Sequence, residues 1–163
     1  MKKSSSLLVV FISSFLFSAL AQAGGSVWDE IKAQFDGPLD IKVYHSPKCG
    51  CCKDWVLHLE KHGFNVDDVK TQEMNSVKSR LGLPANVASC HTAVIDGYLI
   101  EGHVPADDIK RLLSERPNIR GLSVPQMPVG TPGMERGQRK DPFAVVSFDE
   151  QGNIGVFNQY WAY

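Results

Sequence analysis

Three cysteines lie within four residues, and the sequence patterns on either side of them constrain the fold. The alternating β-formers of residues 41–44 predict a strand that leads toward Cys49, Cys51 and Cys52. The apolar spacing of residues 52–62 then predicts a helix. At a helix N-terminus, unpaired backbone N–H groups and the helix dipole favour the thiolate form of a cysteine. The three cysteines are therefore predicted to carry redox or ligand chemistry.

The order of the elements that follow predicts the fold class. The patterns indicate a strand, a second helix, a hairpin that turns at Asp96-Gly97, and a helix that begins at Pro105. With the first strand and helix, this order predicts a thioredoxin-like α/β fold, a small mixed sheet flanked by helices. The predicted bounds are 64–69, 72–81, 92–95 with 98–100, and 105 onward.

Two regions flank this core. Before it, the apolar positions of residues 27–35 predict a short amphipathic helix. After it, residues 121–141 are rich in Gly and Pro without a clear period, and so long a connection is either functional or mobile. Residues 143–148 and 154–160 predict a further β-hairpin at the C-terminus.

The N-terminus has the pattern of a cleavable secretory signal peptide. Lys2 and Lys3 precede an apolar run, residues 7–20, which ends at the small-residue cleavage pattern Ala21-Gln22-Ala23. The run is shorter than a membrane span, so no membrane association is expected after cleavage. We therefore expect a periplasmic protein. The predicted organisation is a signal peptide (1–23) and one domain (24–163) with a core (39–116) and a C-terminal extension (121–163).

Size and charge narrow the function classes. A chain of this length can bury a core without covalent staples, so structural disulfides are not required. The formal net charge of −1 and a pI near 6.5 argue against a nucleic-acid partner.

The spacing of the cysteines suggests two kinds of chemistry. Cys49 and Cys52 have the C-x-x-C spacing of reversible disulfide exchange, which makes them the candidate catalytic pair. Cys51 is better suited to be a ligand or a resolving thiol, because a disulfide to its direct neighbour would strain the backbone. The alternative is purely structural, with one disulfide between Cys49 and Cys52 and another between Cys51 and Cys90.

Two histidines are candidate partners of the cysteines. In thioredoxin-like folds a cis-proline typically precedes the third strand and abuts the cysteine pair, but here Cys90 and His91 stand at that place. His103 falls in the turn before the predicted third helix, near the same end of the sheet. Thiolates with imidazoles select Cu(I), Zn(II) or iron–sulfur centres. For an exported protein Cu(I) is favoured, with a tetrahedral Zn(II) site as the alternative.

Other candidate side chains have plainer interpretations. His58 and His62 share one helix face, which we expect to be solvated. The role of His45, at the end of the first strand, is left open. Met127 and Met134 offer thioethers from the Gly- and Pro-rich segment, although packing is the simpler role.

Several motifs together resemble one known family, the CopG-type periplasmic copper-resistance proteins with a thioredoxin-like fold. The resemblance implies copper binding through the C-x-C-C motif and a redox role in copper tolerance. It carries Cys49, Cys51, Cys52, Cys90 and His91 over as ligand candidates, and His103 less directly. The matching segments are 45–55, 81–84, 89–93, 97–98, 101–106 and 121–135.

The favoured interpretation is a periplasmic copper/thiol oxidoreductase of copper resistance and homeostasis, in which shared thiolates hold Cu(I), as a multinuclear cluster in one version. The expected partners are copper ions and other periplasmic copper-handling or redox proteins. Two alternatives remain open. One is a passive Cu(I) or Zn(II) carrier without turnover, and the other is a metal-free thiol–disulfide oxidoreductase.

Overall fold

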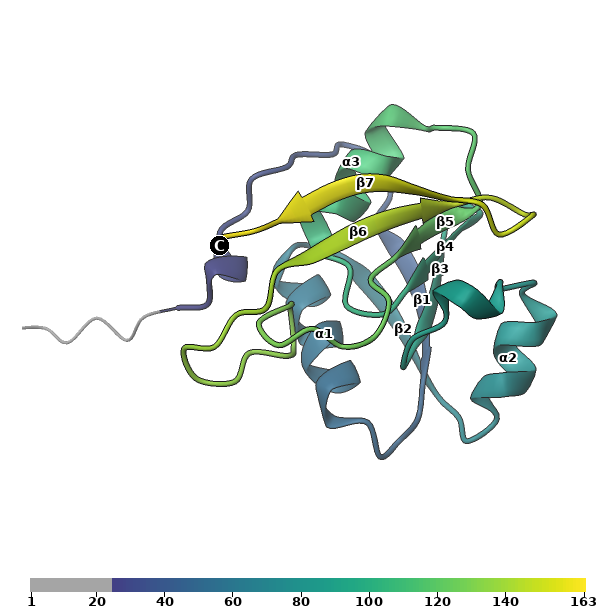
Figure 1. The fold of residues 1–163 in the computed structure, drawn as a ribbon, viewed down its shortest axis with the longest axis horizontal. Helices are drawn as coiled ribbons and strands as arrows, with labels where there is room; N and C mark the ends of the chain where they lie inside the picture. The colour runs from purple at the N-terminus through teal and green to yellow at the C-terminus, as the bar shows by residue number, and fades with distance from the viewer. Residues whose placement is uncertain (1–24) are drawn as a thin grey trace, which may run out of the picture.

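The structure is a computed structural model that describes residues 25–163. The predicted signal peptide lies outside the described residues. Figure 1 shows a twisted sheet with α1 and α3 on one side and α2 on the other. In chain order the elements are β1 (Asp40–His45), α1 (Gly50–Lys61), β2 (Asn65–Lys70), α2 (Met74–Arg80), β3 (Thr92–Ile95), β4 (Tyr98–Glu101), α3 (Ala106–Glu115), β5 (Gly121–Ser123), β6 (Phe143–Phe148) and β7 (Ile154–Tyr160), with short 3-10 helices at Val27–Asp29 and Ala85–Val87.

All seven strands belong to one mixed sheet in the order β2-β1-β3-β4-β5-β6-β7. β1 and β2 are parallel, as are β4 and β5, and the other neighbours are antiparallel. A parallel pair requires a crossover, which α1 provides between β1 and β2. The predicted α/β class, a mixed sheet flanked by helices, is confirmed.

The main core lies between the sheet and the pair α1 and α3. The alternation of β1 buries Ile41 and Val43 against Trp55 and Leu59 of α1. The Trp55 ring is fully buried, and its Nε1 donates to the Val104 carbonyl over 2.9 Å, so the indole ties α1 to the chain just after β4. This contact fixes the start of α1 relative to the end of β4.

The β3–β4 hairpin is confirmed and brings two later parts of the site together. Asp96 and Gly97 both have positive φ, 47° and 83°, as a tight two-residue hairpin turn requires. Because the strands are antiparallel, the residue before β3 lies beside the residue after β4. The Gly102 N–H donates to the His91 carbonyl over 3.0 Å. His91 and His103 therefore meet at one end of the sheet.

The predicted helix at residues 27–35 is wrong beyond its first turn. Only Val27–Asp29 is helical, as a 3-10 turn closed by a capping box. After this turn, the Asp107 carboxylate accepts hydrogen bonds from the backbone N–H groups of Lys32 and Ala33. Those donors are no longer available to a helix, and the segment runs on without regular structure.

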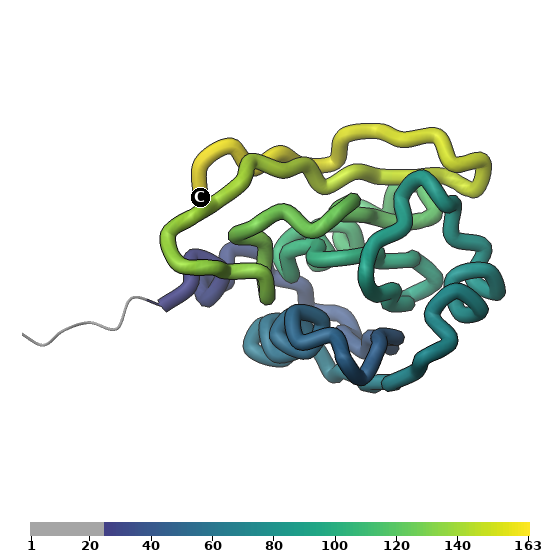
Figure 2. Tube along the Cα trace, turned by 60° about the horizontal axis from the view of Figure 1, so that its bottom comes forward, coloured from purple at the N-terminus to yellow at the C-terminus, as the bar shows by residue number. Residues whose placement is uncertain are grey.

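The predicted loop at 121–141 is wrong at its beginning, where β5 is an interior strand of the sheet. Gly121 fits there because a Cβ atom would collide with the Leu99 carbonyl of β4. The predicted C-terminal hairpin is confirmed as β6 and β7, and it continues the same sheet. Figure 2 shows this hairpin, in yellow, along the side of the molecule opposite the blue helix α1.

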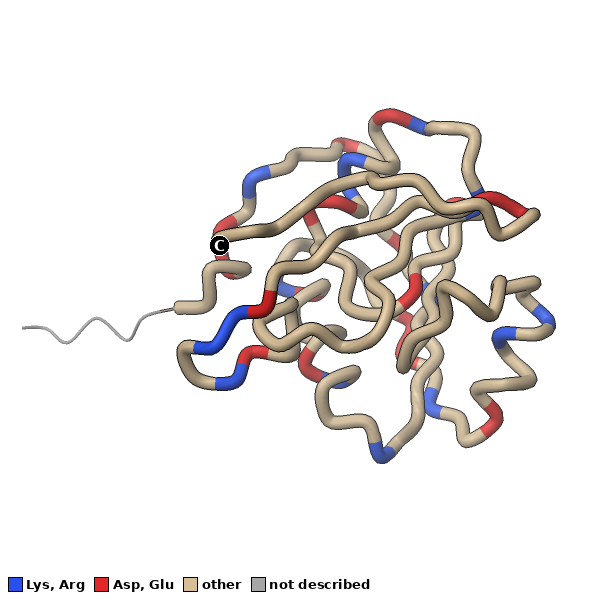
Figure 3. The backbone as a smooth tube through the Cα atoms, in the orientation of Figure 1, with Lys and Arg blue, Asp and Glu red and all other residues tan. Residues whose placement is uncertain are grey.

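Charged residues of both signs are interspersed along the described chain (Figure 3). Within residues 25–163, no helix is long and apolar enough to span a membrane.

Candidate metal centre

The first turn of α1 presents three of the four cysteines. Cys49 is the N-cap residue, and its Sγ accepts from the Cys52 N–H over 3.3 Å. Cys49 and Cys52 are joined by a disulfide, so the C-x-x-C pair is in its oxidised form. Cys52 is fully buried, whereas Cys49 and Cys51 are partly exposed. Of the two disulfide residues, Cys49 is therefore the one that solvent reaches.

The other two cysteines are free thiols that face this disulfide. The Cys51 Sγ is 3.6 Å from the Cys49 Sγ. All four sulfurs lie within 4.8 Å of one another. Cys51 and Cys90 are not joined, so the second disulfide of the structural alternative is not formed in the described chain.

A second group of donors shares one of these sulfurs. The Cys90 Sγ lies 3.2 Å from the His91 Nδ1 and 3.3 Å from the His103 Nε2. The two imidazole rings meet edge to face, with centroids 4.9 Å apart. Cys90, His91 and His103 form a compact ligand set of one sulfur and two nitrogens, and Cys90 belongs to both groups.

Burial controls the protonation of this second group. Burial, and then the neighbouring Cys51 thiol, raises the pKa of Cys90 to about 12. Burial lowers the pKa of His91 well below its usual value, and it also lowers the pKa of His103. Near neutral pH the apo site therefore holds neutral imidazoles and a protonated Cys90 thiol. A cation that binds Cys90 as thiolate must release a proton.

His91 carries a direct sign of an unfilled interaction. Its ring is fully buried and packs on Trp55, with centroids 4.3 Å apart. Its Nε2 is the one buried side-chain nitrogen or oxygen of residues 25–163 without a hydrogen-bond partner. Leaving a buried polar atom unpaired is costly, so it calls for an explanation such as an ion. The other nitrogen of this ring, Nδ1, lies 3.2 Å from the Cys90 Sγ. Sulfur and imidazole nitrogen are the donors of a soft-metal site.

A buried carboxylate behind the site holds the segment that carries Cys90. Glu101, at the end of β4, is fully buried and accepts from the Ser89 N–H over 2.5 Å. It also accepts from the Thr92 hydroxyl over 2.6 Å and pairs with the Lys78 ammonium of α2. No sequence pattern predicted this network. Its one signal is a lone acidic residue at the end of an otherwise apolar strand.

The remaining histidines are structural, and the prediction of a solvated face for His58 and His62 is wrong. The His58 Nε2 accepts from the Ala106 N–H at the start of α3, and the His62 Nδ1 donates to the His58 carbonyl. Both rings are buried, and burial lowers the pKa of His58 to about 3. His45 is also buried, between the Ser46 carbonyl and the Asp68 carboxylate. The spacing Trp55, His58, Leu59, His62 is the buried stripe of α1, which could have identified the face.

The two loop methionines differ in their surroundings. Met127 is 51% exposed, so the expected packing role does not hold for it, whereas Met134 is partly buried.

Comparison with known proteins identifies the family. Two solved structures, named copper resistance protein CopG in forms 1 and 2, are each 52% identical to the chain. They cover 76% of the chain and 98% and 99% of their own, with TM-scores of 0.71 and 0.72. The chain belongs to the CopG family. This confirms the family that the motifs resemble.

Two further comparisons give less information about the family and its function. A family model described as DUF411, a protein of unknown function, matches residues 87–134, which carry Cys90, His91 and His103. A comparison with curated proteins gave no match.

Proposed function

We propose that this protein binds copper ions in the periplasm and acts in copper resistance. The observation that carries the proposal is the convergence of four sulfurs and two imidazoles from three separate segments of the chain. The contacts of the Cys90 Sγ with the His91 Nδ1 and the His103 Nε2 support a ligand at this place. The 52% identity to proteins named for copper resistance supports copper as that ligand.

The donor set favours Cu(I) held by shared thiolates. Crowded thiolates repel one another unless cations neutralise them, and a sulfur can bridge two ions. Cys90 belongs to both ligand groups, so it is the natural bridge between an ion on the sulfur side and an ion beside His91 and His103. Six donors also exceed the four of a tetrahedral zinc site. These features support more than one copper ion in the reduced protein.

The C-x-x-C pair supports a redox step as well as binding. In the proposed step, the reduced thiols of Cys49 and Cys52 give one electron to each of two Cu(II) ions. The products are the Cys49–Cys52 disulfide, two Cu(I) ions and two protons, so electrons and atoms balance. Cys51, Cys90 and the two imidazoles remain as donors for Cu(I) after the disulfide has formed. In this proposal Cys49 and Cys52 are the catalytic residues of a copper/thiol oxidoreductase.

Two other functions have specific support. A passive Cu(I) or Zn(II) carrier fits the Cys90, His91 and His103 group, because neither disulfide cysteine belongs to it. A metal-free thiol–disulfide oxidoreductase fits a thioredoxin-like arrangement, which the strand order β2-β1-β3-β4 and the cysteines at the β1–α1 junction support. The two imidazole nitrogens beside the Cys90 Sγ favour a metal over the metal-free function.

Metal competition tests the proposal. Reduced protein, kept anaerobic and offered limiting equal amounts of Cu(I) and Zn(II), is expected to retain copper almost exclusively, because thiolate-rich sites prefer Cu(I). Elemental analysis after desalting measures both metals in the same sample. Protein with alkylated thiols is the control and should retain neither metal. Stoichiometric zinc without copper would contradict the proposal and favour a zinc carrier.

Export is tested separately at the N-terminus. We expect the mature protein to begin at Gly24, as one domain of residues 24–163, because Ala21-Gln22-Ala23 has the pattern of a cleavage site. The intact mass of protein released from the periplasm measures the cut directly. A mass that retains residues 1–23 would rule out this processing.

Other periplasmic copper-handling or redox proteins are the proposed protein partners.

A further inference from the structure

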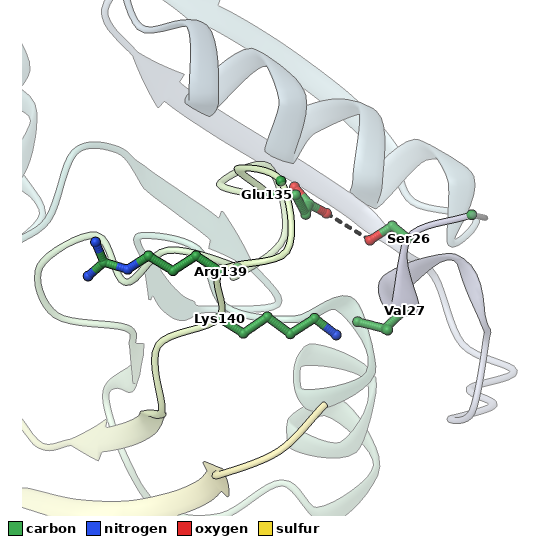
Figure 4. Close-up of a pocket in the computed structure, with 8 residues that line it drawn as sticks. Ser26, Val27, Glu135, Arg139 and Lys140 are labelled. Carbon is green, nitrogen blue, oxygen red and sulfur yellow. Dashed lines mark hydrogen bonds between the residues drawn. The ribbon is translucent and has the colours of Figure 1, made fainter. Parts of the chain in front are cut away.

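Residues 124–141, in the loop between β5 and β6, cross α1 beside the candidate metal centre, and we call them the strap (Figure 1). Four hydrogen bonds from three separate segments tie the strap to the rest of the protein. One of them, from the Ser26 hydroxyl to the Glu135 carboxylate, is drawn in Figure 4. The four bonds are Ser89 Oγ to Gln126 O (2.7 Å), Trp28 Nε1 to Gly130 O (2.7 Å), His103 Nδ1 to Pro132 O (2.8 Å) and Ser26 Oγ to Glu135 Oε1 (2.9 Å).

We propose that the strap holds His103 in the tautomer that presents Nε2 to Cys90, and that Gly133 is the positioning residue that lets the strap do so. The proposal rests on the proposed copper site, because it explains how one of its ligands is oriented. Neither residue is itself a ligand: Pro132 acts through His103, and Gly133 acts through Pro132 and through its contact with the start of α1.

The tautomer follows from the chemistry of the Pro132 carbonyl. A carbonyl oxygen only accepts hydrogen bonds, so the His103 Nδ1 at 2.8 Å must carry the proton. The Nε2 of the neutral ring then has a free lone pair, and it lies 3.3 Å from the Cys90 Sγ. Metal-binding histidines commonly use the second ring nitrogen in this way, which fixes both the tautomer and the ring orientation.

Gly133 sets the distance between the strap and α1. Its φ is +78°, and an added Cβ would lie 2.6 Å from the Trp55 nitrogen and 2.8 Å from the Cys51 carbonyl oxygen. Both atoms are helix backbone, which cannot give way as a flexible side chain can. A side chain at 133 would therefore push the strap outward. Because Pro132 is the preceding residue, its carbonyl would move away from His103.

The same short piece of strap thus contacts two ligand-bearing segments. Pro132 touches His103 after β4, and Gly133 touches the α1 turn that carries Cys51. The strap therefore fixes the two segments relative to each other as well as the ring of His103.

The strap offers a matched control for this glycine. Gly137 also has positive φ, +61°, but a Cβ there would meet nothing within 4 Å. Gly133→Ala and Gly137→Ala therefore share the backbone strain of alanine at positive φ. Only Gly133→Ala adds the collision with α1.

The first test uses the wild-type protein, reduced and free of metal. Nitrogen-15 NMR of the histidine rings distinguishes a protonated from an unprotonated ring nitrogen, and His103→Gln assigns the signal. The expected result is a protonated Nδ1 and an unprotonated Nε2 in His103. A proton on Nε2 instead would overturn the proposal. This readout involves no copper, so it stands apart from the proposed function.

The second test compares the two glycine variants. Gly133→Ala is expected to lose the single tautomer and to bind Cu(I) about 10- to 100-fold more weakly, the usual effect of removing a partner behind a ligand. Gly137→Ala is expected to keep both the tautomer and the affinity. A Gly133→Ala protein with wild-type tautomer and affinity would contradict the proposal, as would equal losses in both variants.

A third variant covers the case in which Gly133→Ala does not fold. Trp28→Phe removes the indole donor to the Gly130 carbonyl and loosens the strap without adding atoms. It should raise the fraction of His103 protonated at Nε2, and an unchanged tautomer would count against the proposal. Wild-type protein with the expected tautomer but no copper binding would instead contradict the proposed function, and it would not contradict the positioning role of the strap.

Discussion

Replacing Cys90 by serine is expected to weaken Cu(I) binding more than any other single substitution at the site. Cys90 belongs to both ligand groups, and its sulfur lies within 3.3 Å of a nitrogen of His91 and of His103. The substitution removes the shared donor. The fall in Cu(I) affinity should therefore exceed the roughly 10- to 100-fold effect that is typical when a residue hydrogen-bonded to a metal ligand is mutated. Competition against a chromophoric Cu(I) chelator, with reduced protein under anaerobic conditions, measures the affinity.

Cys51→Ser is the matched control, because Cys51 belongs to the four-sulfur group alone. It should lower the amount of copper bound while leaving the Cys90, His91 and His103 group in place. Both substitutions exchange one atom at a partly exposed position, so thermal unfolding should show that the fold is retained. Wild-type affinity in Cys90→Ser, or a larger loss in Cys51→Ser, would contradict the assignment of Cys90 as the shared ligand.

Local patterns predicted the part of the fold that carries the site. β1 and α1 have short periods that a single sequence reveals, so the placement of three cysteines at their junction followed from residues 41–62 alone. The Asp96-Gly97 turn fixed the β3–β4 hairpin in the same way. Once the hairpin is known, antiparallel pairing requires the residues before β3 and after β4 to lie side by side. The proximity of His91 and His103 was therefore accessible from the sequence.

Contacts between distant segments were not accessible. β5 lies in a Gly- and Pro-rich stretch, and its pairing with β4 depends on the missing side chain of Gly121. The helix expected at 27–35 was lost to the carboxylate of Asp107, which lies more than seventy residues away. The strap and the Glu101 network are likewise products of tertiary packing. Secondary-structure propensity contains no information about such partners.

Reduction of the Cys49–Cys52 disulfide is expected to raise the copper capacity of the protein. A sulfur in a disulfide offers no thiolate to a metal, so the oxidised form retains only Cys51 and Cys90 as sulfur donors. Because Cu(I) follows the available thiolates, oxidised protein should bind about half as much copper, and more weakly. Titration of both forms measures this directly, and the difference would mean that oxidation and full copper loading exclude one another.

Parallel Cu(I) titrations of reduced and oxidised protein, with free thiols counted at each point, test whether copper binding and the redox couple use the same sulfurs. The double variant Cys49→Ser, Cys52→Ser is the control, because its copper capacity should not respond to the redox state. For the native protein, we expect higher copper capacity and tighter binding in the reduced form, with free thiols disappearing as copper binds. Equal capacity and affinity in the two redox states would contradict this expectation, and would show that copper binding and the redox couple reside on separate residues, as in a passive carrier.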